Sequence, residues 1–186
     1  MMGDSAVGIY SAGYKLGILG LLIVMGFSMG WTPYFLKHNK DRNASLEFST
    51  IATLFLGLHG FIGIIITCIL PVITDISLFG YTIIGSKFFG GLYVVPLILI
   101  AYYFFGMYVL LLPRIYHYES TGMIPYFKFI GALTNIILNF LLIPIFGIVG
   151  SAFATLISFF IMSCYIFYIG NRLEYIQYNL KAWIFP

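Results

Sequence analysis

Residues 129–171 read FIGALTNIILNFLLIPIFGIVGSAFATLISFFIMSCYIFYIGN and contain no charged side chain over 43 residues. The hydrocarbon core of a bilayer is crossed by about 20 helical residues. One helix through the whole stretch would measure about 64 Å, roughly twice the thickness of that core. The stretch therefore predicts two membrane-spanning helices joined by a turn. Pro144, Gly147 and Gly150 interrupt the apolar pattern and place the turn within LIPIFGIVG.

Three more charge-free runs precede this hairpin, at residues 16–36, 48–74 and 88–113. Each run is long enough to cross a bilayer as a helix. The sequence therefore predicts an all-α, polytopic membrane helix bundle with five transmembrane helices. The expected helices cover residues about 10–36, 48–72, 88–113, 124–144 and 148–170.

The composition excludes an ordinary soluble domain. Hydrophobic residues make up 61% of the chain, charged residues 8%, and the mean hydropathy is +1.03. Soluble domains carry about 25% charged residues. The net charge of +3 comes from cations beside the apolar runs, so we expect the lipid bilayer, and no nucleic acid, as a partner.

Basic residues favour one side of the predicted bundle. Two of the nine cations, Lys15 and Lys87, fall on the side of the N-terminus and of the predicted hairpin turn. The other side holds Lys37, Lys40, Arg42, Arg114, Lys128, Arg172 and Lys181. Because cytoplasmic loops carry an excess of Lys and Arg, the C-terminus is predicted to be cytoplasmic. Residues 75–87 are expected to lie along the outer interface. Residues 171–186 are expected to form an inner interfacial tail or the start of a further helix.

The predicted helix 124–144 carries a polar stripe. Lys128, Asn135 and Asn139 fall within about 40° of arc, with Ala132 between them. Unpaired amides and charges are costly against lipid, so the stripe is expected to face other helices or a hydrated cavity. Two hypotheses stay open: the asparagines join neighbouring helices by hydrogen bonds, or the stripe lines a substrate pathway with Lys128 at its cytoplasmic mouth.

The predicted helix 10–36 carries a second aromatic and polar stripe. Tyr14 is its candidate pathway residue, and Lys15 lies about 100° away. Lys15 either extends to the interface or contacts substrate. The stripe as a whole consists of Tyr10, Tyr14, Ser28, Trp31 and Thr32.

Small residues recur at helix-packing intervals, as in Gly13–Gly17, Gly26–Gly30 and Gly150–Ala154–Ser158. Such spacing predicts close contacts between helices. Pro96 is predicted to lie inside the helix 88–113 and to bend it. His59 falls in the middle of a span without an acidic or second histidine partner at helical spacing, which favours a neutral, hydrogen-bonded ring.

Catalytic signatures are missing from the sequence. It has no H-E-x-x-H, no G-x-S-x-G and no phosphate-binding glycine loop, and its carboxylates lie in or beside the predicted loops. We therefore expect a protein that is not an enzyme and that holds no metal.

Residues 131–160, GALTNIILNFLLIPIFGIVGSAFATLISFF, resemble a signature of the multidrug/oligosaccharidyl-lipid/polysaccharide exporter superfamily. The matching features are two asparagines one turn apart, an L-I-P turn and a G-x-x-G-[AS]-A-x-A-T helix start. VGIYSAGYKL at residues 7–16 and WTPYFLK at residues 31–37 resemble its polysaccharide transport branch. The three stretches occur in the order of that branch.

This resemblance implies a MATE-like C-terminal lobe, with the five helices corresponding to the eighth to twelfth of the family. Its members flip undecaprenyl-diphosphate-linked oligosaccharide from the cytoplasmic to the outer leaflet by alternating access. The resemblance also implies a bacterial or archaeal cell membrane and an N-terminal lobe of the same protein, which residues 1–186 do not include. H⁺ or Na⁺ is the coupling ion to expect, with no other cofactor. A glycan polymerase or glycosyltransferases are the protein partners to expect. The alternatives are ion-coupled efflux of small molecules and a non-transporting scaffold in a glycan-assembly complex.

Overall fold

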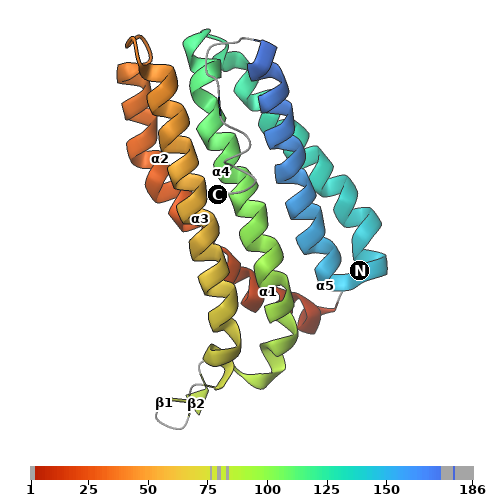
Figure 1. The fold of residues 1–186 in the computed structure, drawn as a ribbon. Coiled ribbons are helices and arrows are strands. Elements are labelled where there is room, and N and C mark those ends of the chain that lie inside the picture. The colour runs from red at the N-terminus through yellow and green to blue at the C-terminus, as the bar shows by residue number, and fades with distance from the viewer. Residues whose placement is uncertain (1–2, 76, 79–80, 83, 173–177, 179–186) are drawn as a thin grey trace.

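The computed structural model describes residues 3–75, 77–78, 81–82, 84–172 and 178 (Figure 1). Its long elements are α1 (Asp4–Gly17), α2 (Leu19–His38), α3 (Ala44–Asp75), α4 (Val95–His117) and α5 (Ile124–Arg172). The 3-10 helices η1 (Ser86–Val94) and η2 (Thr121–Met123) precede α4 and α5. Between α3 and η1, β1 (Ser77–Leu78) pairs antiparallel with β2 (Tyr81–Thr82).

The element α5 is a helical hairpin rather than a single rod. Gly147 breaks it with φ 58° and ψ −132°, a backbone conformation that glycine adopts without steric cost. The two arms, residues 124–146 and 148–172, then run antiparallel beside each other (Figure 1). Gly150 allows the close approach, since a Cβ there would lie 2.4 Å from the Leu142 carbonyl oxygen. The predicted turn is confirmed.

Four helical stretches within the described residues are long and apolar enough to cross a membrane: 19–38, 44–73, 86–117 and 121–172. The last of them contains the hairpin and is long enough to cross twice. The prediction of an all-α membrane bundle is confirmed. The chain is a multi-pass membrane protein.

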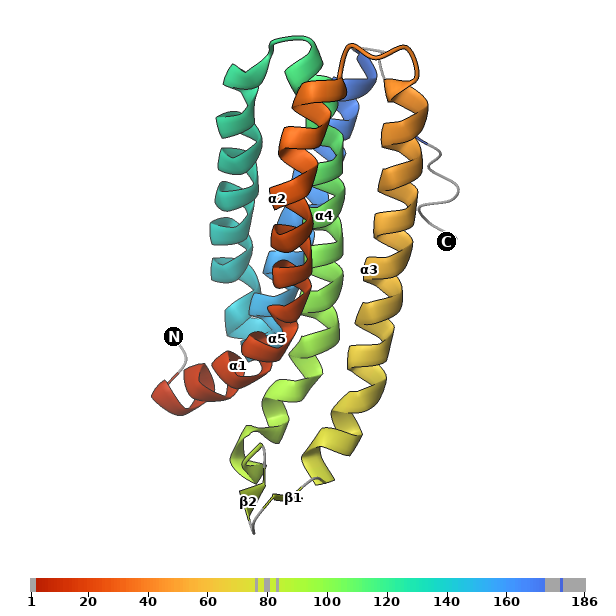
Figure 2. The same cartoon turned by 90° about the vertical axis from the view of Figure 1, so that its left-hand side faces the viewer.

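Helix α4 lies at the centre of the bundle and is covered by α2, α3 and the second arm of α5 (Figure 2). About 61% of the residues in the apolar part of this span are buried inside the protein, whereas the share is 17–22% for the other spans. Tyr108, Leu110 and Ile115 of α4 are almost completely buried. They belong to a core that also contains Phe48 of α3 and Phe127 of α5.

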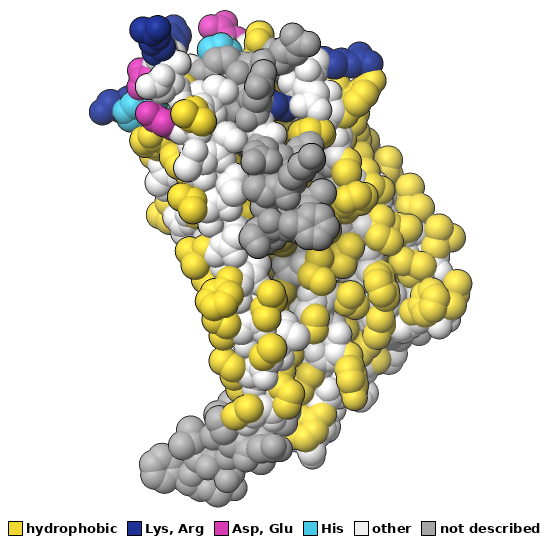
Figure 3. Space-filling view, in the orientation of Figure 1, with side chains coloured by type: hydrophobic (Ala, Val, Ile, Leu, Met, Phe, Trp, Pro, Cys, Tyr) yellow, Lys and Arg dark blue, Asp and Glu magenta, His cyan; other side chains and the backbone are white. Residues whose placement is uncertain are grey.

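The outer faces of the bundle are apolar. On α3, Leu46, Leu54 and Ile64 are 73%, 69% and 64% exposed. Figure 3 shows hydrophobic side chains along the length of the bundle and charged side chains gathered at one end. Such a wide apolar surface is expected where lipid is the solvent.

The predicted helix 10–36 is not one straight span, which corrects the sequence-based boundary. The chain bends at Ile18, and α1 lies crosswise to α2 at the bundle's lower end (Figure 2). Gly17 and Gly20 flank the bend and pack closely against Ile98 and Tyr102 of α4. Glycine close to a bend is a known cause of a helix kink. The spanning segment is therefore α2 alone.

The prediction that Pro96 bends the inside of a helix is wrong. Pro96 lies in the first turn of α4, directly after the 3-10 helix η1. Proline is tolerated in a first turn because the backbone N–H groups there have no partner within the helix. The expected span 88–113 is therefore divided between η1 and α4, which continues to His117.

The α2–α3 connection, the α4–α5 connection and the end of α5 all lie at the charged end of the bundle (Figures 1 and 3). They share one side, as the loop charges predict. The expected outer interfacial segment 75–87 contains β1 and β2 at the opposite end. The expected tail 171–186 lies outside the described residues except for 171, 172 and 178.

Glycines set the contact between α1 and η1. A Cβ at Gly13 would lie 1.9 Å from the Gly91 carbonyl oxygen, so the two backbones touch. On the second arm of α5, Gly150, Ala154 and Ser158 are all buried, as their spacing predicts. The prediction is wrong for Gly26 and Gly30, because a Cβ at either would meet no atom within 4 Å.

We predict that Gly13→Ala destabilises the folded chain by about 1–3 kcal/mol, because the new methyl group would overlap a backbone oxygen that cannot move away. Gly63→Ala is the control, since its Cβ would meet no atom within 4 Å. The control should be neutral or slightly stabilising. Thermal unfolding in detergent measures both, and equal melting temperatures would contradict the contact.

Candidate functional site

Two amides bond each other inside the α5 hairpin, and one of them also bonds the opposite arm. Asn135 Nδ2 donates to Thr155 Oγ1 at 3.4 Å, from the first arm to the second. Asn139 Nδ2 donates to both Oδ1 and the backbone oxygen of Asn135, each at 2.9 Å. Asn139 Oδ1 is buried and has no hydrogen-bond partner among the described residues. Asn135 therefore bonds the second arm and accepts from Asn139, whose own Oδ1 is left without a partner among the described residues.

Helix α1 brings Tyr10 to the same hairpin and Tyr14 to α4. The Tyr10 hydroxyl faces the Ser151 and Thr155 side chains. The rings of Tyr10 and Tyr14 lie 5.6 Å apart at 41°. The Tyr14 hydroxyl in turn hydrogen-bonds the Tyr102 hydroxyl of α4 at 2.6 Å.

We call this set the tyrosine–amide cluster. It consists of Tyr10, Tyr14, Tyr102, Asn135, Asn139, Ser151 and Thr155. Six of its members are half-buried, and Tyr102 is 3% exposed. Hydroxyls and amides facing hydrocarbon without partners are costly, so a cluster of this kind suits a hydrated cavity or an interface better than lipid.

The cluster lies towards the turn of the hairpin. Asn139 and Thr155 are each eight residues from Gly147, or about 12 Å along their helices. The charged end of the bundle lies at the other end of the same arms (Figure 3). The cluster is therefore nearer the weakly charged side of the membrane.

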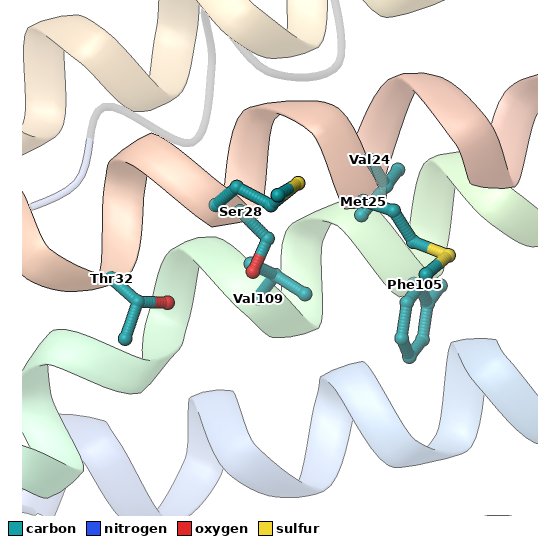
Figure 4. A pocket seen from close by; sticks show the side chains of 7 residues that line it. Val24, Met25, Ser28, Thr32, Phe105 and Val109 are labelled. Carbon is teal, nitrogen blue, oxygen red and sulfur yellow. The ribbon is translucent and has the colours of Figure 1, made fainter.

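A second feature is an open, mainly apolar cavity of about 410 Å³ between α2 and α4. Ser28 and Thr32 line it from α2, and Phe105 and Val109 line it from α4 (Figure 4). The remaining lining residues are Val24, Met25 and Met29.

Aromatic rings connect the cavity with the cluster. Phe105 lies 5.2 Å from the Phe159 ring, and Phe159 lies 5.8 Å from Tyr102. A continuous row of packed aromatic rings from α4 and the second arm of α5 therefore joins the tyrosine–amide cluster to the α2–α4 cavity.

The structure separates the two predicted lysines from this cluster. Lys128 and Lys15 are both exposed. Lys128 lies seven residues before Asn135, about 10 Å away along the helix and towards the charged end. Of the predicted pathway residues, the structure brings together Tyr14, Asn135 and Asn139.

The stripe predicted on residues 10–36 is also divided. The bend at Ile18 separates the residues on α1 from those on α2, so they no longer lie on one helix face. Tyr10 faces the hairpin and Tyr14 bonds Tyr102 of α4, whereas Ser28 and Thr32 line the cavity. Trp31 points towards α3 and packs edge-on against Phe48, with ring centroids 5.3 Å apart.

His59 is a packing residue at the centre of the bundle. It is 3% exposed, and its ring lies near the Gly20 backbone and between the rings of Phe55 and Tyr103. Its Nδ1 is buried without a hydrogen-bond partner among the described residues, so the neutral, hydrogen-bonded ring expected from the sequence stays a prediction. Because the ring contacts α2, α3 and α4, it joins the central helices.

Arg114 is a buried residue that sequence reasoning assigned to a loop. It lies in the last turn of α4 and is 4% exposed. Its Nη1 donates to Asn171 Oδ1 at 2.6 Å, and its guanidinium lies 4.7 Å from the Tyr178 ring centroid. The Tyr178 hydroxyl donates to the Leu110 backbone oxygen at 2.8 Å. Arg114 therefore holds the end of α5 and Tyr178 against α4, a role that no local pattern indicates.

Part of the chain resembles a curated membrane protein. A protein of Methanocaldococcus jannaschii, named Uncharacterized membrane protein MJ1068, is 45% identical over 56 residues, or 30% of this chain and 11% of that protein. The chain thus matches about a tenth of that relative's length. No protein-family model matches the chain, and no solved structure matches it. The likeness agrees with a membrane protein and carries no activity with it.

We predict that Tyr14→Phe lowers the unfolding free energy by about 1–2 kcal/mol, because it leaves the buried Tyr102 hydroxyl without its partner. Tyr126→Phe is the matched control, since Tyr126 is 67% exposed. Thermal unfolding in detergent should separate the two variants. The hydroxyl pair contributes nothing to stability if both unfold like the parent chain.

Proposed function

We propose that this chain forms part of the C-terminal lobe of a flippase for lipid-linked oligosaccharides used in surface polysaccharide biosynthesis. The observation that supports this proposal best is the contact between two stretches that carry the sequence resemblance. Residues 7–16 contribute Tyr10 and Tyr14, and residues 131–160 contribute the remaining polar members except Tyr102. Segments far apart in the chain thus meet in one polar cluster, as a substrate-lining surface requires.

The transport mechanism that fits this lobe is alternating access. The bundle has one highly buried helix, α4, around which the others are arranged. The open cavity on α2 and the half-buried cluster are surfaces that a second lobe of the same protein would face. Lipid-linked oligosaccharide would pass between the two lobes, with H⁺ or Na⁺ as the coupling ion. A glycan polymerase or glycosyltransferases would act before or after it.

This role requires no catalysis by the chain. An efflux transporter for cations would be expected to place a carboxylate in its pathway. Glu47, Asp75 and Asp4 lie at the ends of their helices instead. The flippase proposal therefore explains the side chains of this lobe better than cation efflux does.

We predict that deleting the gene in its host abolishes display of the corresponding surface glycan. Asn135→Leu and Asn139→Leu should impair display more than they reduce the amount of protein in the membrane, because they remove polar groups of the cluster. Thr67→Val on α3 is the control, since that hydroxyl bonds only its own helix at Gly63. If the host has no second exporter and still displays the glycan normally after the gene is deleted, the proposed function is wrong. Activity lost only in proportion to protein would assign the asparagines to packing.

We also predict that the charged end faces the cytoplasm, because seven of the nine cations belong to that side. A single cysteine placed by Asn43→Cys should resist a membrane-impermeant maleimide in intact cells, whereas Ser86→Cys should react. Both test positions are exposed, at opposite ends of the bundle. The native Cys68 and Cys164 are exposed as well and must first be replaced by alanine. The opposite labelling pattern would invert the orientation.

A further inference from the structure

The chemistry of the tyrosine–amide cluster indicates which part of a substrate it recognises. We infer that the cluster binds an uncharged sugar unit through hydroxyl and amide hydrogen bonds and through tyrosine ring faces. This inference rests on the proposed function for its biological meaning, but the binding itself can be tested separately.

The hydrogen-bonding groups of the cluster are neutral. Its members are tyrosine, serine and threonine hydroxyls and two carboxamides, and none forms an ion pair or a charged hydrogen bond in the described structure. The nearby lysine of α1, Lys15, is exposed on another face. A phosphate here would lack the cationic donors that such groups usually receive, and a cationic ligand would lack a carboxylate. A sugar hydroxyl both donates and accepts, so it suits these groups.

Several hydrogen-bonding positions remain open. Asn139 Oδ1 has no partner among the described residues. In the Tyr14–Tyr102 pair one hydroxyl donates to the other, so one hydroxyl hydrogen is still available. The Tyr10 hydroxyl faces the Ser151 and Thr155 side chains, and its ring lies 5.6 Å from that of Tyr14. A polyol that entered between α1 and the hairpin would meet these groups without displacing the bond from Asn135 to Thr155.

The aromatic part of the cluster adds an apolar contact. Tyr10 and Tyr14 are half-buried, and their rings are inclined to each other at 41°. Ring faces of this kind pack against the C–H face of a pyranose while the hydroxyls on its edge find polar partners. The combination of two rings with neutral donors and acceptors distinguishes this site from a purely structural hydrogen bond.

The depth of the cluster gives it a place in transport. It lies about 12 Å from the hairpin turn, on the side that the proposed orientation places outside. A sugar bound there would be near release into the outer leaflet. The diphosphate of the same substrate must find its cations elsewhere, in the other lobe or at the charged end.

The test is saturation-transfer difference NMR on the full purified chain in nanodiscs. The probes are neutral gluco-, galacto- and manno-trisaccharides, with inorganic pyrophosphate as the anionic competitor. We expect saturation transfer to at least one trisaccharide, no competition by pyrophosphate, and little change with added salt. Thr155→Val and Tyr10→Phe should each weaken binding about tenfold. The matched controls Thr67→Val and Tyr126→Phe should leave it unchanged.

Absence of transfer to all three sugars would overturn the inference, as would displacement by pyrophosphate or equal weakening by the controls. Melting temperatures of the variants separate lost binding from lost folding, and a folded Tyr10→Phe variant with unchanged binding also counts against it. The proposed function fails separately. If the chain binds sugar but glycan display stays normal after gene deletion, the flippase proposal is wrong and the sugar site stands. If display is lost but no sugar binds, the flippase proposal stands and the sugar site is wrong.

Discussion

The reversal of the chain at Gly147 is the constraint on which the candidate site depends. In a bilayer each backbone group must be bonded within its own helix, so a 43-residue apolar stretch can turn back only where that pattern can be broken. Gly147 takes a positive φ there, and Gly150 lets the arms close against each other. Asn135 and Thr155 then lie opposite each other, which a continuous helix would keep about 30 Å apart.

A second level of organisation comes from close helix crossings. Lipid offers no hydrophobic force between helices, so their association relies on packing and on hydrogen bonds. The Gly13–Gly91 contact and the packing of Gly17 against Ile98 hold α1 across the end of the bundle. This crosswise helix carries Tyr10 to the α5 hairpin and Tyr14 to Tyr102 of α4. The polar cluster therefore exists because small residues allow α1 to approach.

The two ends of the molecule have different chemistry. At one end the exposed charges gather, and Arg114 is held between Asn171 and Tyr178. Nearer the other end, the tyrosine–amide cluster consists of neutral hydroxyls and amides that are mostly half-buried. A lobe of this kind divides its polar contacts along the membrane normal, which agrees with the proposed substrate having an anionic part and a neutral part.

The sequence by itself determined membrane residence, the five spans, the turn near Gly147 and the shared side of the basic loops. These features depend on hydrophobic length and on local backbone freedom, which are properties of consecutive residues. Only the tertiary structure decided that residues 10–36 bend at Ile18, that Arg114 is buried, and that Tyr10 meets the hairpin that carries Asn135. Those outcomes depend on contacts between segments as distant as Tyr14 and Tyr102. No periodicity along the chain records such contacts.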